Sequence, residues 1–453
     1  MIIVCLAIGY FAGYVSKKNV IVKSTNDSSI INEVYDTLDK YWVNTNDQDV
    51  NLNTSAIEGM VAGLNDPHSS YLTSKEAVEF NQTVAGNYQG IGVGFSMVEQ
   101  GAMITKVYSD SPASKAGLKV GDIITKADGN ELAQASTDQV RDYVRGEDGT
   151  EVTLTILNNQ KTSDVTVTRG ALDTSAFYEI RKQGNVSFGY IELSTFGTDT
   201  AKQVEIALEM FKKKNIQTLV IDLRDNGGGY LTAATDILDL FFTSDEVIYQ
   251  MKEKNSAAKK YYAESDKKYE FENGYILVNE NTASASELTA GALQSEKGYQ
   301  LIGKTTYGKG SAQTQKTLSD GSVLKYTYAK WMIPNGTCIN GKGLTPDEEV
   351  DNVSLSGITT KDVKETLKVD CVNTRIKSMQ KMLNILGYSV DREDGYFSVN
   401  TQAALQQFEI DNHLNVDGEY SQSDKQMLVA RMMIYINNHE NDKQYDQLIK
   451  IIK

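Results

Sequence analysis

The chain has 453 residues, of which 40% are hydrophobic and 23% are charged, and its formal net charge is −15. This length and hydrophobic content predict about three globular domains with substantial cores. The acidic balance argues against nucleic acid as a binding partner. Three scattered cysteines are too few for a disulfide framework or a zinc site. We therefore expect neither a metal nor another cofactor.

The N-terminus carries an apolar run, residues 1–15, followed by Lys17 and Lys18. This run is shorter than the ~20 residues of a spanning helix, and it lacks the basic start and the cleavage site of a signal peptide. We expect a signal anchor over residues 1–18 whose first part lies upstream of Met1. The anchor would attach the protein to the cell membrane, with its other domains outside the cytoplasm. A secreted or wall-associated protein and a buried core helix are the alternatives.

Residues 19–85 are interpreted as a polar linker followed by a helical cap. Apolar residues recur at helical spacing over Ile31–Tyr41 and again over Ile57–Leu64. Ser55 and Glu58 fit a capping box at the start of the second of these helices.

Residues 86–170 change to short strands punctuated by glycine. Ser111–Gly117 predicts a single helical turn that Gly117 ends. Ser136 and Gln139 predict a capped helix, and the alternation over Val152–Ile156 predicts a strand. This order of elements resembles a PDZ domain.

The PDZ resemblance implies a binding site for peptide C-termini. Gly90, Ile91, Gly92 and Val93 would form the loop whose N–H groups capture the terminal carboxylate, while a sheet edge accepts the peptide as an added strand. The alternative is that these glycines only form a tight turn. Arg145, at the end of the predicted helix, is a candidate for coupling this domain to the next one, and a solvated arginine is the alternative.

Residues 171–350 alternate strands with helices, which predicts an α/β core. The apolar stretch Thr218–Leu223 is typical of a buried parallel strand. The glycines at Gly227–Gly229 follow it, but they lack the spacing of a phosphate-binding loop.

The chemistry is expected where the apolar strand Tyr275–Val278 leads into a helix rich in alanine. Ser284 stands at this junction, beside the free N–H groups of a helix start, where an oxyanion could be stabilised. Lys309 follows between two glycines, and a desolvated lysine can act as a base. We interpret Ser284 as a nucleophile and Lys309 as its base. The alternative is a capping box, in which Ser284 and Glu287 only begin the helix.

The histidines argue against a different serine chemistry. The chain has three, and two of them, His413 and His439, belong to the C-terminal part. The part of the chain that would carry a Ser–His–Asp triad therefore offers few candidates for its histidine.

Three motifs together resemble the C-terminal processing peptidases, also called tail-specific proteases. In chain order the motifs are Asp222–Gly229, Thr282–Glu287 and Tyr307–Gln313. The resemblance implies that Ser284 is the nucleophile, Lys309 the general base and Gln313 the residue that orients the lysine. It also implies an oxyanion hole made by the N–H groups of Gly228 and Ala285.

The C-terminal part is interpreted as a linker, residues 351–371, and a helical domain with a tail, residues 372–453. Two Asp-Gly turns each precede a helix that Ser398 or Ser421 would cap. With a helix over Met379–Leu386 they predict a three-helix module that resembles type 1 peptidoglycan-binding domains. The resemblance implies peptidoglycan as a partner, and a helical packing or dimerisation module is the alternative.

Together these features predict a multidomain α/β protein with a helical cap, a β-rich PDZ domain, an α/β serine-protease core and a C-terminal three-helix module. We expect a serine endopeptidase of the cell envelope that recognises protein substrates through their free C-termini. The segment 372–430 would then be dispensable for cleaving a soluble peptide. The alternative is a non-catalytic scaffold, but a scaffold has no need of Ser284, Lys309 and Gln313 together.

Overall fold

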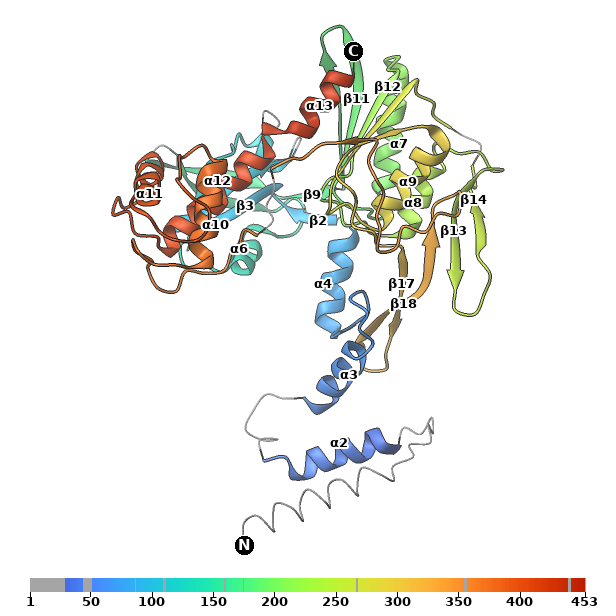
Figure 1. The fold of residues 1–453 in the computed structure, drawn as a ribbon, viewed down its shortest axis with the longest axis horizontal. Coiled ribbons are helices and arrows are strands. Elements are labelled where there is room, and N and C mark those ends of the chain that lie inside the picture. Colours follow the sequence, from blue (N-terminus) through green and yellow to red (C-terminus); the bar gives the residue numbers. More distant parts are fainter. Residues whose placement is uncertain are drawn as a thin grey trace. The chain divides into compact units, whose positions relative to one another are not determined.

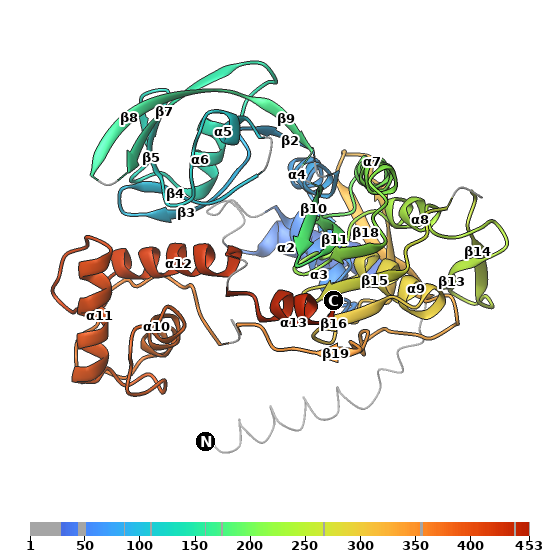
Figure 2. The ribbon, with the colours of Figure 1, turned by 90° about the horizontal axis from the view of Figure 1, so that it is seen from above.

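The structure is a computed structural model, drawn as a ribbon in Figures 1 and 2. It describes residues 29–43, 51–85, 87–108, 111–158, 160–173, 175–265, 268–353, 357–438 and 441–452. The signal anchor expected over residues 1–18 lies outside the described residues. Within the described ranges, none of the helices combines the length and apolar character that crossing a bilayer requires.

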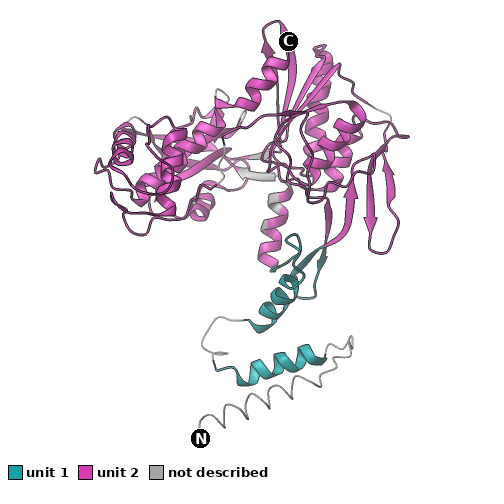
Figure 3. Ribbon diagram, in the orientation of Figure 1, with its two compact units in different colours: residues 1–73, 315–326 teal, residues 74–314, 327–453 magenta. Residues whose placement is uncertain are grey.

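The chain divides into two compact units, which Figure 3 colours separately. The smaller unit comprises residues 1–73 and 315–326, and the larger one comprises residues 74–314 and 327–453.

In its described residues, the smaller unit contains two helices and a short sheet. Its elements are α2 (Ser29–Tyr41), α3 (Leu52–Ala62) and β1 (Ser70–Leu72), which pairs antiparallel with residues 323–325 of β18 (Val323–Met332). The capping box predicted at Ser55 and Glu58 is wrong. Helix α3 begins earlier, because the side chain of Asn51 accepts a hydrogen bond from the N–H of Thr54 and caps the helix there.

Within the described residues, the PDZ-like part contains a six-stranded β-sheet, a two-stranded sheet and three helices. Its elements are α4 (Ser74–Ala85), β2 (Asn87–Gly90), β3 (Val93–Val98), β4 (Gly101–Val107), α5 (Pro112–Lys115), β5 (Ile123–Ala127), β6 (Asn130–Glu131), α6 (Thr137–Val144), β7 (Glu151–Asn158), β8 (Lys161–Thr168) and β9 (Gly170–Asp173). The strand order is β3-β4-β5-β7-β8, which places β3 at an edge. The predicted capping box of α6 is confirmed, since Ser136 and Gln139 exchange both hydrogen bonds, at 2.8 and 3.2 Å.

The α/β core is built on a largely parallel sheet. Its elements are β10 (Ala176–Gln183), β11 (Val186–Leu193), α7 (Thr200–Lys213), β12 (Thr218–Asp222), α8 (Leu231–Leu238), β13 (Val247–Glu253), β14 (Lys259–Tyr262), β15 (Asn273–Val278), α9 (Ala285–Lys297), β16 (Gln300–Gly303), β17 (Ser311–Thr317), the second half of β18, and β19 (Glu348–Glu349). The sheet order is β10-β11-β12-β15-β16-β19. Strand β12 is buried along its whole length and parallel to both neighbours, as predicted.

The predicted three-helix module comprises three capped helices and is followed by a fourth helix. These are α10 (Thr374–Ile385), α11 (Val399–Asp411), α12 (Gln422–Asn437) and α13 (Lys443–Ile451). Ser398 and Ser421 cap α11 and α12, as predicted. The module is not a separate body, because Val98 and Met103 of the PDZ sheet belong to its hydrophobic core. Helix α12 packs against β3 and β4 (Figure 2).

The two faces of the peptidase-like sheet are covered by different parts of the chain. Side chains alternate between the faces of a strand, and on one face Leu219 and Ile221 of β12 pack in a core with α7, α8 and α9. On the other face Val220 packs in a core that contains Leu448 of α13 and Ile452. The C-terminal helix is therefore a layer of the α/β core.

Candidate active site

Ser284 occupies a sharp turn between β15 and α9. Its φ of +57° and ψ of −117° match the first central position of a type II′ turn, which ordinarily takes glycine. The N–H of Ser286 donates to the carbonyl of Ala283 at 3.2 Å and closes the turn. A non-glycine residue in such a conformation stores about 1–3 kcal/mol of strain and persists only where its surroundings impose it. Hydrolases present a nucleophilic serine at strained strand-to-helix turns of this kind.

Asn226, in the neighbouring loop, stabilises this turn through hydrogen bonds. Its carbonyl accepts hydrogen bonds from the N–H of Ala283 at 3.0 Å and from the hydroxyl of Ser286 at 2.9 Å. Its side-chain amide donates to the carbonyl of Leu193 at 2.7 Å, and the residue is completely buried. The turn that carries Ser284 is thereby fixed to the end of β11.

Gly228 lies against Ser284. A Cβ atom on Gly228 would stand 2.9 Å from the Cβ of Ser284 and 2.9 Å from the nitrogen of Ala285, and its φ is +99°. Only glycine fits this position. The N–H of Gly228 donates to the side-chain oxygen of Asn226 at 2.9 Å, so an oxyanion would have to share or replace this bond.

Ala285 is the first residue of α9, where N–H groups lack a partner within the helix. The structure thus brings the two residues assigned to the oxyanion hole, Gly228 and Ala285, next to each other. Their role as donors stays a prediction.

The buried carboxylate of Glu287 joins the Ser284 turn to the Lys309 loop. It accepts the N–H groups of Ser284, Gly308 and Lys309 at 2.9, 2.6 and 2.8 Å, and the hydroxyl of Thr306 at 2.5 Å. Four donors match the acceptor capacity of an ionised carboxylate, and they offset the cost of burying its charge.

The Glu287 half of the capping box considered at Ser284 is therefore present, because the carboxylate accepts the Ser284 N–H. Ordinary N-cap residues have an extended backbone, however, and Ser284 does not. Capping alone gives no reason for a strained serine at this position.

The backbone of Lys309 is held between two glycines and the chain segment 339–343. A Cβ on Gly308 would lie 2.7 Å from the nitrogen of Gly343, and one on Gly310 would lie 2.9 Å from Asn340. The N–H of Gly310 donates to the side chain of Asn340 at 3.2 Å. The glycines thus let two segments meet closely, and Lys309 itself is half-buried.

Gln313 projects from β17 with its amide orientation fixed. Its NH₂ group donates to the hydroxyls of Ser311 and Thr327, at 2.9 and 3.1 Å. An ammonium group requires an acceptor, so the amide oxygen is the atom through which Gln313 would orient Lys309.

The predicted carboxylate loop lies between β2 and β3. The carbonyl of Ile91 accepts from the N–H of Ala113 at 2.8 Å, and the carbonyl of Gly92 accepts from Tyr108 at 3.1 Å. In a trans peptide the N–H points opposite to the carbonyl, so the N–H groups of Gly92 and Val93 point away from these donors. Two N–H groups of the loop are thus directed away from β4 and α5.

Arg145 ends helix α6 and reaches this loop. A Cβ on Gly90 would lie 3.8 Å from the Cγ of Arg145. The predicted coupling of Arg145 to the peptidase stays a prediction. An ion pair that sequence reasoning missed does link the two domains, between Lys106 of β4 and Glu192 of β11 at 2.7 Å.

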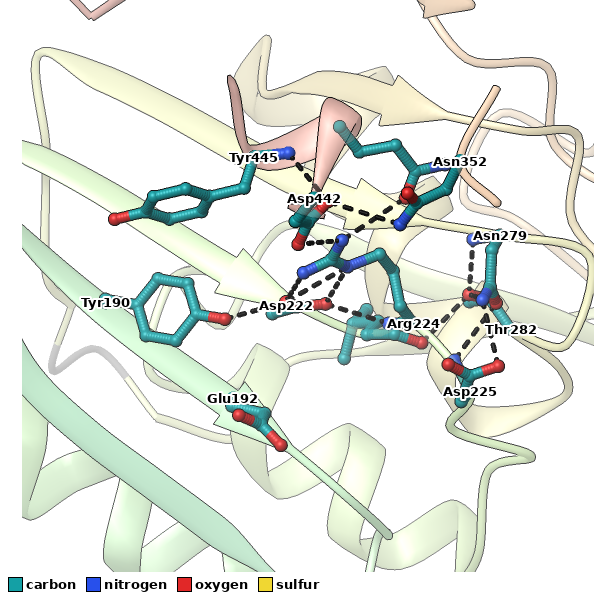
Figure 4. Close-up of polar contacts among 12 residues, drawn as sticks. Tyr190, Glu192, Asp222, Arg224, Asp225, Asn279, Thr282, Asn352, Asp442 and Tyr445 are labelled. Carbon is teal, nitrogen blue, oxygen red and sulfur yellow. Dashed lines mark hydrogen bonds and ion pairs between the residues drawn. The ribbon is translucent and has the colours of Figure 1, made fainter. Parts of the chain in front are cut away.

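Sequence reasoning also missed the connecting roles of Glu287 and Asn226. Glu287 is the one charged residue between Thr282 and Gln294, and a carboxylate in such a stretch could have been recognised as a buried acceptor. Asn226 gave no signal beyond its place in the Asp222–Gly229 motif. Figure 4 shows the neighbouring Asp225, which accepts from the side chain of Asn279 at 2.9 Å.

Comparison with known families matches three segments of the chain. Residues 187–350 match peptidase family S41, residues 89–168 match the PDZ domain, and residues 373–428 match a peptidoglycan binding domain.

Curated proteins and a solved structure are similar over most of the chain. A "Probable CtpA-like serine protease" of Staphylococcus saprophyticus is 32% identical over 422 residues, which cover 93% of this chain and 84% of that protein. The protein of the same description from Staphylococcus aureus strain COL is 33% identical over 443 residues, covering 97% and 88%. The solved structure of a photosystem II D1 C-terminal processing protease is 26% identical, with a TM-score of 0.43, and covers 72% of this chain and 94% of that chain.

The two adjacent glycines provide a matched test of the site. Gly228→Ala should lower cleavage of unfolded casein by roughly 100-fold or more, because the new methyl group collides with Ser284 and displaces the loop. Gly227→Ala should leave the rate close to wild type, since nothing lies within 4 Å of its Cβ position. Initial rates of both variants, with circular dichroism as a check of folding, measure this. Equal rates for the two variants would contradict the placement of Gly228 beside the nucleophile.

Proposed function

Because the chain belongs to peptidase family S41, as a CtpA-like serine protease with a PDZ domain, we propose that it cleaves proteins through a Ser284–Lys309 dyad. The observation that carries this proposal is the strained turn at Ser284, which Glu287 ties to the Lys309 loop. A nucleophile and a base are thus held on two loops that share one buried acceptor. Such preorganisation of reacting groups is a major source of rate enhancement.

The proposed reaction proceeds by acyl transfer. The neutral amine of Lys309 takes the proton of the Ser284 hydroxyl as its oxygen attacks the substrate carbonyl, and Gln313 orients the amine. The N–H groups of Gly228 and Ala285 stabilise the resulting oxyanion. Lys309 then gives the proton to the leaving amine. Water releases the acyl group by the same steps in reverse order.

Substrates are proposed to enter through the PDZ domain by their free C-termini. The N–H groups of Gly92 and Val93 would bind the terminal carboxylate, and the edge strand β3 would pair with the residues before it. The guanidinium of Arg145, beside Gly90, would add positive charge to this end of the groove.

The cell envelope is the proposed place of action. The match of residues 373–428 to a peptidoglycan binding domain supports peptidoglycan as a partner. The apolar residues 1–15 support attachment to the membrane, with the catalytic domain on the outer side.

The dyad is tested by substitutions in the chain from residue 26 onward. Ser284→Ala should abolish cleavage of unfolded casein, because no other group forms the acyl-enzyme. Lys309→Arg should be as inactive as Lys309→Ala, since arginine keeps the charge but does not release its proton. Gln313→Ala should retain intermediate activity.

Only the neutral amine of Lys309 accepts a proton, so the wild-type rate should rise with pH.

Two outcomes would count against the dyad. If Ser284 only capped the helix, Ser284→Ala would lower stability by about 1 kcal/mol and leave cleavage intact. A folded Lys309→Arg variant that cleaves at nearly the wild-type rate would show that Lys309 is not the base.

Recognition of C-termini is tested with paired peptides. A peptide with apolar last residues should bind more weakly when its C-terminus is amidated, because amidation removes the charge that the loop at Gly92 and Val93 would hold. Isothermal titration calorimetry with the inactive Ser284→Ala chain measures both affinities. Equal affinity for the acid and the amide rules out the carboxylate loop.

Wall binding is tested on the whole chain, because the helical module shares its core with the PDZ sheet. The protein should pellet with purified peptidoglycan and stay in solution with cellulose. Quantifying the supernatant measures this. Equal pelleting with both polymers, or with neither, would argue against peptidoglycan as a specific partner.

A further inference from the structure

Helix α13 closes the α/β core on the face opposite α7, α8 and α9. Its Leu448 is fully buried, and Leu448 and Ile452 share a hydrophobic core with Tyr190, Val220 and Leu277 of the sheet. Residues 442–452, which lie beyond the peptidoglycan-binding match, thus belong structurally to the peptidase core.

Asp442, at the start of α13, has two roles. One carboxylate oxygen accepts the N–H of Tyr445 at 3.0 Å and caps the helix. The other oxygen accepts a hydrogen bond from the guanidinium of Arg224 at 2.5 Å. The side chains of Arg224 and Asp442 are 12% and 7% exposed, so this ion pair is largely shielded from water (Figure 4).

Arg224 lies between two carboxylates. Its Nε and Nη2 atoms donate to Asp222 at 2.9 and 2.6 Å, and the hydroxyl of Tyr190 donates to the same carboxylate at 2.7 Å. Burial raises the pKa of Asp222, but the attraction of Arg224 together with the hydrogen bonds from Arg224 and Tyr190 outweighs burial and holds that pKa below its ordinary value. The remaining nitrogen, Nη1, donates to Asp442 and, at 3.4 Å, to Gln444. Both residues belong to the α13 segment, by which we mean residues 442–452, that is, α13 with the residue on either side of it.

Arg224 is also the first residue of a loop whose last residue, Gly228, lies against Ser284. We call residues 224–228 the oxyanion loop. Asp225 is held by the side chains of Asn279 and Asn281, at 2.9 and 2.7 Å. Gly228, at the other end, lies against Ser284. The α13 segment therefore binds the loop at the end opposite to the nucleophile.

We propose that Asp442 is a positioning residue for the peptidase reaction: by holding Arg224, it sets where the oxyanion loop places Gly228 beside Ser284. This inference rests on the serine-peptidase chemistry proposed above. Asp442 does not touch the substrate and acts through Arg224.

Asp442→Asn separates this role from helix capping. Asparagine caps helices as well as aspartate does, so the bond to Tyr445 is kept, while the charge that faces Arg224 is lost. Asp446→Asn is the matched control, because Asp446 is an exposed carboxylate in the first turn of the same helix. Both substitutions change the net charge equally.

The experiment measures kcat and KM with a short peptide substrate, and the rate at which a fluorophosphonate probe labels Ser284. Asp442→Asn should lower kcat and the labelling rate by about 10- to 100-fold, the loss expected from a small misplacement of catalytic groups, and should leave KM within about twofold. Arg224→Lys should show the same pattern, because lysine lacks the guanidinium fork. Asp446→Asn should match wild type.

Thermal unfolding of each variant fixes a temperature at which all are folded, and the rates are compared there. Unchanged kcat and labelling in Asp442→Asn would overturn the proposal, whatever its melting temperature. Equal losses in Asp442→Asn and Asp446→Asn would also overturn it, since the effect would then belong to the helix as a whole. A wild-type chain that neither cleaves nor reacts with the probe would refute the proposed function instead.

Discussion

One buried carboxylate holds together the two loops on which the peptidase site depends. Glu287 is inaccessible to water, and its charge is stable there only because four donors surround it. All four belong to the segments that carry Ser284 and Lys309. The acceptor is therefore satisfied only when both loops are in place, so the backbones of Ser284 and Lys309 are ordered together.

Close approach of the backbone is the second requirement of the site. Gly228 meets Ser284, and Gly308 and Gly310 meet the segment 339–343, at distances that exclude a side chain. The strain at Ser284 is sustained by these contacts and by Asn226, which anchors the turn from the adjacent loop. Hydrogen bonds to Asn226 and Glu287 thus hold one serine in a conformation that is costly for any residue other than glycine.

Local signals in the sequence were sufficient for much of the fold. Ser136, Ser398 and Ser421 cap helices where the spacing predicts them, and the apolar run at β12 is a buried parallel strand. The start of α3 was misplaced because Asn51 and Ser55 are both good caps, and only the structure shows which one is used. The motifs predict Ser284 and Lys309 as site residues, whereas the sequence indicates for Glu287 only a role as a cap partner. The Arg224–Asp442 pair had no signal at all, because its partners lie 218 residues apart.

The position of α13 has a consequence for the order in which the protein is made. Residues 442–452 leave the ribosome after the rest of the peptidase and after both binding modules. Until they arrive, one face of the central sheet, including Val220 and Leu277, is uncovered, and Arg224 lacks its second carboxylate. Each newly synthesised molecule therefore passes through a stage in which the three peptidase motifs have been synthesised, but one face of the central sheet is still exposed to solvent. A protease built in this way completes the core of its α/β domain only after its PDZ and peptidoglycan-binding segments have been made.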